Sequence, residues 1–347
     1  MAKPIYHSSI EGAQHGSKGL DGFLAFAKEA GAAGAQPSNY MLEGKSGVGF
    51  TRAHLVRKAF EKNELKLDGI SGHCMFWVHT SAWTGTKGMR PFLPPDIAKL
   101  AKGKIELWAE EYILRLLDLS AALNIKILPM FWGASHGWEL ATGYPWGFWA
   151  GGNFDLIKEG EERFVKKTAK IRAHANSLGI YLAHEIHPGT AAMCAEEFGR
   201  LVEICDGDPC LTVNADPSHC WEGESWETRF THPAVADRVY GCHVKNYVVR
   251  PGVPLRKMEG NWRNRAMQFT DLGSGDLNMV RYAEMLINIG YPARYNKIMG
   301  TDTAPLIAET ESNYRDPDAT AIEGIQYVRD HLCFPVAEGS FEDEMGA

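Results

Sequence analysis

The chain has 347 residues, of which 45% are hydrophobic and 23% are charged, and its formal net charge is −7. This composition is typical of a globular protein with a large core. The acidic balance argues against nucleic acid as a main partner, because phosphate binding requires clustered cations. No run of about 18 apolar residues occurs, and the first residues lack an apolar signal-peptide core, so we expect neither membrane insertion nor export.

The seven cysteines are scattered along the chain, without a CxxC pair and in an odd number. This pattern indicates reduced thiols in a cytoplasmic protein. Cys220 follows His219 and Cys242 precedes His243, which raises the alternative of a thiolate nucleophile. Cysteine is also a common small buried residue, so packing explains both positions more simply.

Short apolar runs alternate with longer amphipathic runs along the chain, as expected for repeated βα units. The predicted strands lie at 3–9, 34–39, 69–77, 125–132, 180–187, 211–216, 239–245 and 304–309. The predicted helices lie at 19–32, 53–64, 94–124, 153–179, 190–205, 232–239, 276–289 and 318–332, and 94–124 is long enough for two helices.

About eight such units without a strong break favour a (β/α)₈ barrel, with a doubly wound open sheet as the alternative. We expect one domain over residues 1–335, followed by an acidic tail at 336–347. Two long insertions, at about 131–152 and 246–275, predict long loops at the C-terminal face of the barrel.

Four successive predicted strands carry polar side chains where they end: Glu185, then Asp216, then His243, then Glu309. The carboxyl ends of barrel strands meet at one face, so these side chains are expected to converge. Buried carboxylates are costly without a partner, and oxygen and nitrogen donors together suit Mn²⁺, Mg²⁺ or a similar ion. The alternative is a polar network neutralised by Arg and Lys.

The segments HEIHPGT, NADPSH, CHVKN and LIAETES resemble, in this order, the motifs of the xylose isomerase-like TIM-barrel superfamily. That group includes sugar isomerases, ketose epimerases and inosose-type lyases. The resemblance implies one divalent metal ion, with Mn²⁺ favoured over Mg²⁺, Co²⁺ or Zn²⁺. It also implies the following roles: Glu185, Asp216, His243 and Glu309 as ligands, Glu185 and Glu309 as proton-transfer groups, and His219 as a substrate contact. Lys245 and Arg250 are further candidates for substrate contacts, and Arg250 stands in an insertion that interrupts the family pattern.

Such a ligand set predicts a defined chemistry. A cation that bridges a carbonyl and a neighbouring hydroxyl acidifies the C–H between them, and Glu185 or Glu309 then removes that proton to give an enediolate. Reprotonation gives epimerisation or isomerisation, and expulsion of a β-substituent gives elimination. The ligands alone leave all three outcomes open.

The insertion at 131–152 is rich in aromatic residues, which bind sugar faces and aryl groups or pack a loop onto the barrel. Its GYPWGFW segment and the stretch from Ile10 to His15 also resemble, less specifically, the large subunit of bacterial C-glycoside deglycosidases. That resemblance implies cleavage of 3-oxo aryl glycosides together with a small β-type subunit. Trp138 and Trp146 would then contact substrate, and His136 would serve the leaving aryl group unless it is only a hydrogen-bonded loop residue.

Lyase-type deglycosidation by β-elimination is therefore the favoured function. The main alternative is a ketose epimerase or aldose–ketose isomerase acting on a free sugar or inositol derivative. An abasic-site endonuclease would require more metal-binding histidines and a basic surface. A non-catalytic sugar-binding barrel would not require two glutamates beside a metal. We expect a cytoplasmic enzyme that binds neither nucleic acid nor membrane.

Overall fold

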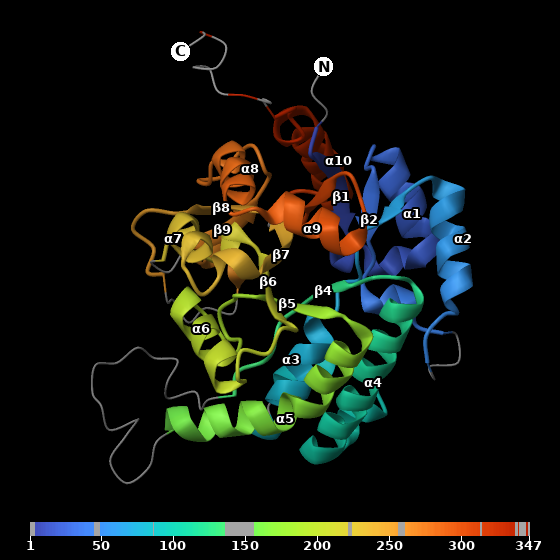
Figure 1. Ribbon diagram of the computed structural model, residues 1–347, viewed down its shortest axis with the longest axis vertical. Helices are drawn as coiled ribbons and strands as arrows, with labels where there is room; N and C mark the ends of the chain where they lie inside the picture. Colours follow the sequence, from blue (N-terminus) through green and yellow to red (C-terminus); the bar gives the residue numbers. More distant parts are fainter. Residues whose placement is uncertain are drawn as a thin grey trace.

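The computed structural model describes residues 4–44, 49–85, 87–135, 156–220, 224–255, 261–312 and 314–336, together with 339 and 345. Its centre is a sheet of parallel strands that curls into a barrel (Figure 1). In the described residues this sheet has eight strands, ordered β3-β2-β1-β10-β7-β6-β5-β4. Their bounds are β1 Tyr6–Glu11, β2 Gly34–Gln36, β3 Lys66–Leu67, β4 Ile127–Met130, β5 Tyr181–Glu185, β6 Leu211–Ala215, β7 Val239–Val244 and β10 Ala304–Ala308.

The ring of strands is completed between β3 and β4 by the chain that follows β3. There the Gly72 N–H donates a hydrogen bond to the carbonyl of Pro129 in β4 (3.0 Å). Strand order around the ring follows chain order, as in a (β/α)₈ barrel. The predicted fold class is therefore confirmed, and the open doubly wound sheet is wrong.

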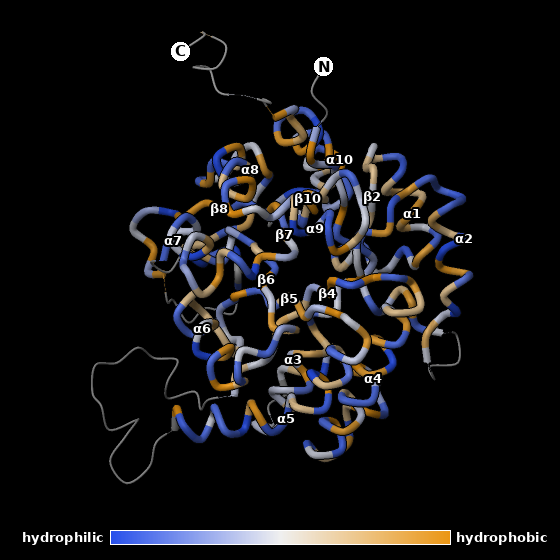
Figure 2. Tube along the Cα trace, in the orientation of Figure 1, coloured by the Kyte–Doolittle hydropathy of each residue, from blue (hydrophilic) through white to orange (hydrophobic). Residues whose placement is uncertain are grey.

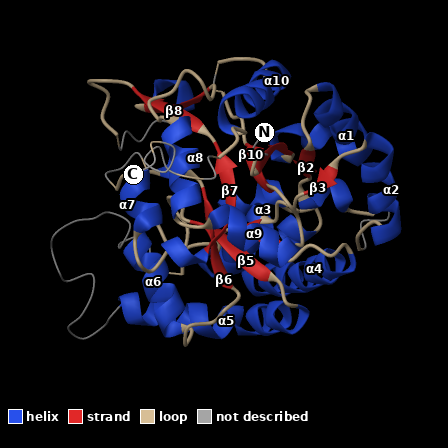
Figure 3. Cartoon of the chain, turned by 45° about the horizontal axis from the view of Figure 1, so that its top comes forward, coloured by secondary structure: helices blue, strands red, loops and turns tan. Residues whose placement is uncertain are grey.

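Helices surround the strands on the outside (Figure 3). α4 shows why: its buried residues Ile105, Ala109, Ile113 and Leu116 recur every three or four positions and form one apolar face. Hydrophobic and hydrophilic segments accordingly alternate along the outer helices (Figure 2). The α-helices are α1 Gly19–Glu29, α2 Ala53–Asn63, α3 His73–Ser81, α4 Lys102–Ala122, α5 Leu156–Leu178, α6 Ala195–Ile204, α7 Trp226–Thr231, α8 Met279–Asn288, α9 Tyr291–Met299 and α10 Pro317–Tyr327. None of the described helices is long and apolar enough to cross a bilayer.

The strand predicted at 69–77 is wrong. β3 is confined to Lys66–Leu67, and α3 begins at His73. A short apolar run cannot by itself distinguish a buried strand from a buried helix. In α3, Met75, Phe76 and Val78 are all buried, so helical amphipathicity is absent from the sequence pattern.

The insertion at 246–275 contains an unpredicted antiparallel hairpin, β8 Asn246–Val249 and β9 Met267–Thr270. The helix predicted at 232–239 is only a short 3₁₀ turn at Ala236–Arg238, preceded by α7. Most of the insertion at 131–152 and most of the tail lie outside the described residues.

Candidate metal centre

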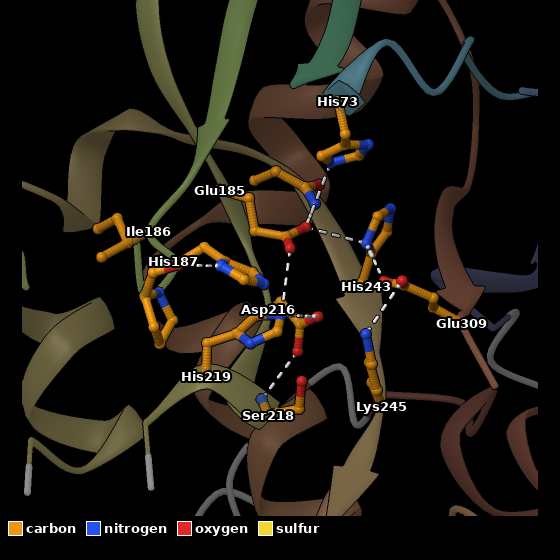
Figure 4. A network of polar contacts seen from close by, with 12 residues as sticks. His73, Glu185, Ile186, His187, Asp216, Ser218, His219, His243, Lys245 and Glu309 are labelled. Carbon is orange, nitrogen blue, oxygen red and sulfur yellow. Dashed lines mark hydrogen bonds and ion pairs between the residues drawn. The ribbon is translucent and has the colours of Figure 1, made fainter. Parts of the chain in front are cut away.

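The four residues expected to converge lie at the carboxyl ends of four neighbouring strands (Figure 4). Glu185 is the last residue of β5, Asp216 follows β6, His243 lies near the end of β7, and Glu309 follows β10. One donor atom from each lies within 4.8 Å of the donor atoms of the others. The barrel thus gathers three carboxylates and one imidazole at one point, as the sequence predicts.

The contacts inside this group lack hydrogen-bond geometry. His243 Nδ1 lies 2.8 Å from Glu309 Oε2 and 3.1 Å from Glu185 Oε2. Nevertheless His243 Nδ1, Glu309 Oε2 and Asp216 Oδ2 make no hydrogen bond with any described residue, although all three atoms are buried. Buried polar atoms without partners are rare in proteins and require an explanation. Donor atoms that converge without bonding one another are what a cation site provides.

Outer contacts fix the orientation of these groups. The Oε1 atom of Gln36 lies 3.1 Å from His243 Nε2 and accepts its proton, so Nδ1 is the ring nitrogen that a cation would bind once it gives up its own proton. The Oδ1 atom of Asp216 accepts the Ser218 N–H at 2.8 Å and leaves Oδ2 for a ligand. Hydrogen bonds of this kind, from residues outside the ligand set, are a regular feature of metal sites. They fix the tautomer of a ligating histidine and the orientation of a ligating carboxylate.

The same Asp216 contact explains why β6 stops where it does. Pro217 has no N–H for a strand ladder, and the Asp216 side chain caps a 3₁₀ turn over Pro217–His219. The turn carries His219 back toward the barrel axis. Its Nε2 lies 3.2 Å from Glu185 Oε1 and 3.3 Å from Asp216 Oδ2.

The two glutamates are held by different neighbours. Glu185 Oε2 accepts a hydrogen bond from Asn214 Nδ2 at 2.9 Å, on the adjacent strand. Glu309 Oε1 accepts one from the buried amino group of Lys245 at 3.0 Å, and Glu311 lies 2.5 Å from the same amino group. Each glutamate therefore has one fixed oxygen.

Charge compensation shapes the pKa values of this cluster. Burial disfavours the charged form of Glu309, but Lys245 and His243 outweigh it and hold the pKa of Glu309 below its usual range. Burial likewise disfavours the His219 imidazolium, but Asp216 and Glu185 raise the pKa of His219 to about 9. In the absence of a metal ion, the cationic side chains of Lys245, His243 and His219 therefore balance the buried carboxylates.

A cavity of about 390 Å³ opens onto the cluster. His73, His187 and His219 line it, and all three take part in two overlapping three-residue groups around Glu185 that could also hold an ion. These groups are His73–Glu185–His243 and Glu185–His187–His219. The four-residue group is the fullest donor set of the three.

Glu11, at the end of β1, was not among the sequence candidates and also lines the cavity. Its Oε2 accepts the Ala13 N–H at 2.5 Å, and its Oε1 is buried without a partner among the described residues. Burial and the negative charge of Glu309 raise the pKa of Glu11 to about 8. The other carboxylates were predicted because they stand where a predicted strand ends. Glu11 would have been predicted in the same way if the first strand had been predicted to extend to residue 11.

Only some of the residues predicted to contact substrate line the cavity in the described part of the chain. His219 and Lys245 line the cavity, and the amino group of Lys245 lies 4.2 Å from the centre of the Phe269 ring. Arg250 does not line it, because its guanidinium donates instead to the carbonyl of Arg265. His136, Trp138 and Trp146 lie outside the described residues.

All seven cysteines lie in described segments and carry free thiols. Burial raises the pKa of the Cys220 thiol to about 12 and that of the Cys242 thiol to about 11. A thiolate is the reactive form of cysteine, so neither residue is suited to nucleophilic catalysis near neutral pH.

Comparison with known proteins agrees with this fold. Residues 24–331 match the family described as xylose isomerase-like TIM barrel. No curated protein matches the sequence. Many solved structures share the fold, and three of them are described below. Their low sequence identity establishes the likeness of fold alone.

The first is a 3-keto-D-glucoside 4-epimerase from E. coli, with a TM-score of 0.59 and 13% identity over 93% of this chain and 99% of that one. The second is a probable 3-DHS dehydratase from Bacillus anthracis, with a TM-score of 0.58 and 14% identity over 93% and 99%. The third is a D-allulose 3-epimerase from Methylomonas sp., with a TM-score of 0.54 and 13% identity over 95% and 99%. The family match spans most of the barrel and includes all four strand ends of the cluster, so the chain belongs to the xylose isomerase-like TIM-barrel family.

Proposed function

We propose that this protein is a divalent-metal-dependent enzyme that removes a proton next to the carbonyl of a keto-sugar and forms an enediolate. The observation that carries the proposal is the convergence of Glu185, Asp216, His243 and Glu309, three of which (Asp216, His243 and Glu309) present a buried atom without a hydrogen-bond partner among the described residues. Three carboxylate oxygens and one imidazole nitrogen suit Mn²⁺ best, with Mg²⁺, Co²⁺ or Zn²⁺ as alternatives.

A bound cation would supply Lewis-acid polarisation of the sugar carbonyl. Side chains of the protein would carry out proton removal and substrate orientation. Glu185 or Glu309 takes the proton from carbon. Either is suitable, because a hydrogen bond to one carboxylate oxygen fixes the orientation of the second oxygen of the same side chain. His219 and Lys245 present N–H donors on the cavity wall and orient the sugar oxygens.

For the fate of the enediolate we propose β-elimination from a 3-oxo aryl glycoside. In this reaction His136 would serve the leaving group, Trp138 and Trp146 would contact the aryl part, and a small β-type subunit would complete the enzyme. The alternative is epimerisation or isomerisation of a free sugar or inositol derivative. The names of the similar structures include a keto-glucoside epimerase, a dehydratase and a free-ketose epimerase, so the fold is compatible with both outcomes. The free thiols are in keeping with a cytoplasmic enzyme.

Proton–deuterium exchange followed by NMR in D₂O tests the proposal. The protein is incubated with Mn²⁺ or Mg²⁺ and either a panel of free ketoses or a 3-oxo aryl glycoside. Deuterium entry into a free ketose, together with an epimer or isomer, would favour the alternative. Release of the aglycone with free ketoses untouched would support elimination. No exchange in any substrate, with metal binding confirmed, would contradict the enediolate mechanism for this chain acting alone.

A further inference from the structure

Some buried side-chain atoms around the cavity at the metal centre have no hydrogen-bond partner among the described residues. They belong to Glu11, Gln14, His73, His219 and Glu309. Two of them face Glu185, since His73 Nε2 and His219 Nε2 lie 3.3 Å and 3.2 Å from its oxygens. Glu309 Oε2 faces His243 at 2.8 Å. The other two, Glu11 Oε1 and Gln14 Oε1, belong to residues outside every group that could hold an ion in the described chain.

Both of these oxygens come from the turn that follows β1. Glu11 is the last residue of the strand, and a 3₁₀ turn covers Ala13–Lys18. Between them the Gly12 N–H donates to the Gln36 carbonyl in β2 at 3.0 Å. A Cβ atom at Gly12 would come within 3.1 Å of neighbouring atoms, so glycine allows the turn to lie this close to β2. The two side chains therefore start from a tightly packed backbone.

Glu11 has one oxygen engaged and one available. The side chain is buried, and its Oε2 accepts the Ala13 N–H at 2.5 Å. The Ser71 hydroxyl also acts on this carboxyl, but the hydrogen-bond partner of its Oγ is His73 Nδ1 at 2.9 Å. Oε1 is the oxygen that remains for a ligand.

Gln14 is oriented by two carboxylates. Its Nε2 donates to Glu311 Oε1 at 2.8 Å and to Glu309 Oε1 at 3.4 Å. Because only the nitrogen of an amide can donate, these contacts fix which end of the side chain is which. Gln14 Oε1 is therefore an acceptor, and a ligand that satisfies it must bring a proton.

The charges around the cavity decide what kind of group this is. A phosphate or carboxylate has no proton to give to Gln14 Oε1. Lys245 is the one lysine or arginine among the described lining residues, and its amino group already lies 3.0 Å from Glu309 and 2.5 Å from Glu311. A hydroxyl group both donates and accepts, so it pairs with Gln14 Oε1 and with the Glu11 carboxyl in either protonation state.

We propose that Glu11 Oε1 and Gln14 Oε1 bind hydroxyl groups of the substrate and select a neutral polyhydroxylated sugar over a phosphorylated or acidic one. The two residues supply acceptors on the β1 side of the cavity, whereas Lys245 and His219 carry N–H groups. That the ligand is a sugar rests on the proposed function, but the two oxygens are features of the fold itself.

The test uses polyols without a carbonyl group, so that binding is measured apart from proton transfer. 1,5-Anhydro-D-glucitol, 1,5-anhydro-D-galactitol and myo-inositol are titrated with the protein at saturating Mn²⁺. Bound Mn²⁺ broadens the proton NMR signals of a ligand beside it, which gives Kd at this cavity. Tyr40→Phe is the control variant, because its hydroxyl borders the same cavity but already donates to the Phe92 carbonyl at 3.4 Å.

Glu11→Met and Gln14→Met should each weaken the Kd of the tightest polyol about three- to tenfold, as expected for one lost hydrogen bond. Glu11→Gln keeps a hydrogen-bonding group and should lose less. The loss in Gln14→Met should vanish for one monodeoxy form of that polyol, the form without the hydroxyl that Gln14 binds. Tyr40→Phe should bind like the wild type, and a phosphate ester of the polyol should bind it more weakly than the polyol itself.

Glu11→Met also removes the acceptor of the Ala13 N–H, so thermal melts first establish that each variant folds. Gln14 is half-buried, and Gln14→Met carries the test if Glu11→Met does not fold.

Four results would overturn the assignment: no polyol binding to the wild type, equal losses for every monodeoxy form, an equal loss in Tyr40→Phe, or tighter binding of the phosphate ester. Polyol binding that depends on Glu11 and Gln14, without deuterium exchange in any keto-sugar, would contradict the proposed function and not this assignment.

Discussion

Replacing Asp216 by asparagine separates metal binding from folding at a single residue. Oδ1 of Asp216 caps the turn by accepting a hydrogen bond from the Ser218 N–H. Oδ2 accepts no hydrogen bond from the described residues and is the oxygen expected to bind the metal. Asparagine keeps an oxygen for the turn and puts an amide NH₂, which has no lone pair for a cation, in place of the donor. The variant should therefore fold normally and lose metal affinity.

The magnitude follows from linkage between binding and folding. Free metal at one hundred times its dissociation constant stabilises the native state by about 2.7 kcal/mol. For 347 residues, the entropy of unfolding is about 0.7 kcal/mol per kelvin, so Tm of the wild type should rise by about 4 °C. Asp216→Asn should show a shift near zero at the same Mn²⁺ concentration.

Thermal melts of wild type, Asp216→Asn and Asp216→Ala, each with and without Mn²⁺, provide the assay. The alanine variant is the control, because it also leaves the buried Ser218 N–H without its acceptor and should lose about 1–2 kcal/mol without metal. That loss corresponds to about 2 °C in Tm. A metal-induced shift in Asp216→Asn as large as that of the wild type would refute the assignment of Asp216 as a ligand.

Three further outcomes are expected. Gln36→Leu removes the acceptor of His243 Nε2–H and should weaken metal affinity about 10- to 100-fold in a titration. Gln36→Glu keeps an acceptor and should restore much of that affinity. Equal losses of affinity in the two variants would contradict the role of Gln36 in orienting His243. Lys245→Met leaves Glu309 and the half-exposed Glu311 without their cation, so urea unfolding of the metal-free protein should show a loss of about 2 kcal/mol. Lys245→Arg should lose less, and an unchanged midpoint in Lys245→Met would count against the pairing. Burial lowers the pKa of His79 to about 4. The unfolded state therefore binds more protons below about pH 6.5, and stability falls by about 2 kcal/mol from this residue between pH 7 and pH 5. His79→Leu should lose that much less over the same interval, and identical pH profiles would refute the linkage.

The barrel and the convergence of three carboxylates with a histidine could be predicted because both follow from short-range pattern and topology. Parallel strands end at one face, so a polar residue at each strand end is placed without knowledge of the loops. Asp216 and Glu309 illustrate this, since each directly follows a buried apolar strand.

The parts that were missed depend on tertiary contacts. α3 is buried on several sides, so its sequence resembles a strand, and the hairpin β8–β9 is concealed in a polar insertion. Arg250 seemed available for substrate, yet it is engaged by the Arg265 carbonyl across that hairpin.

A crystal structure of the protein soaked in Mn²⁺, with anomalous data collected at the manganese edge, tests the central claim most directly. The account predicts one strong anomalous peak coordinated by Glu185, Asp216, His243 and Glu309, the four residues whose donor atoms converge. A peak held instead by His187 and His219, or no peak among these strand ends at saturating Mn²⁺, would contradict it.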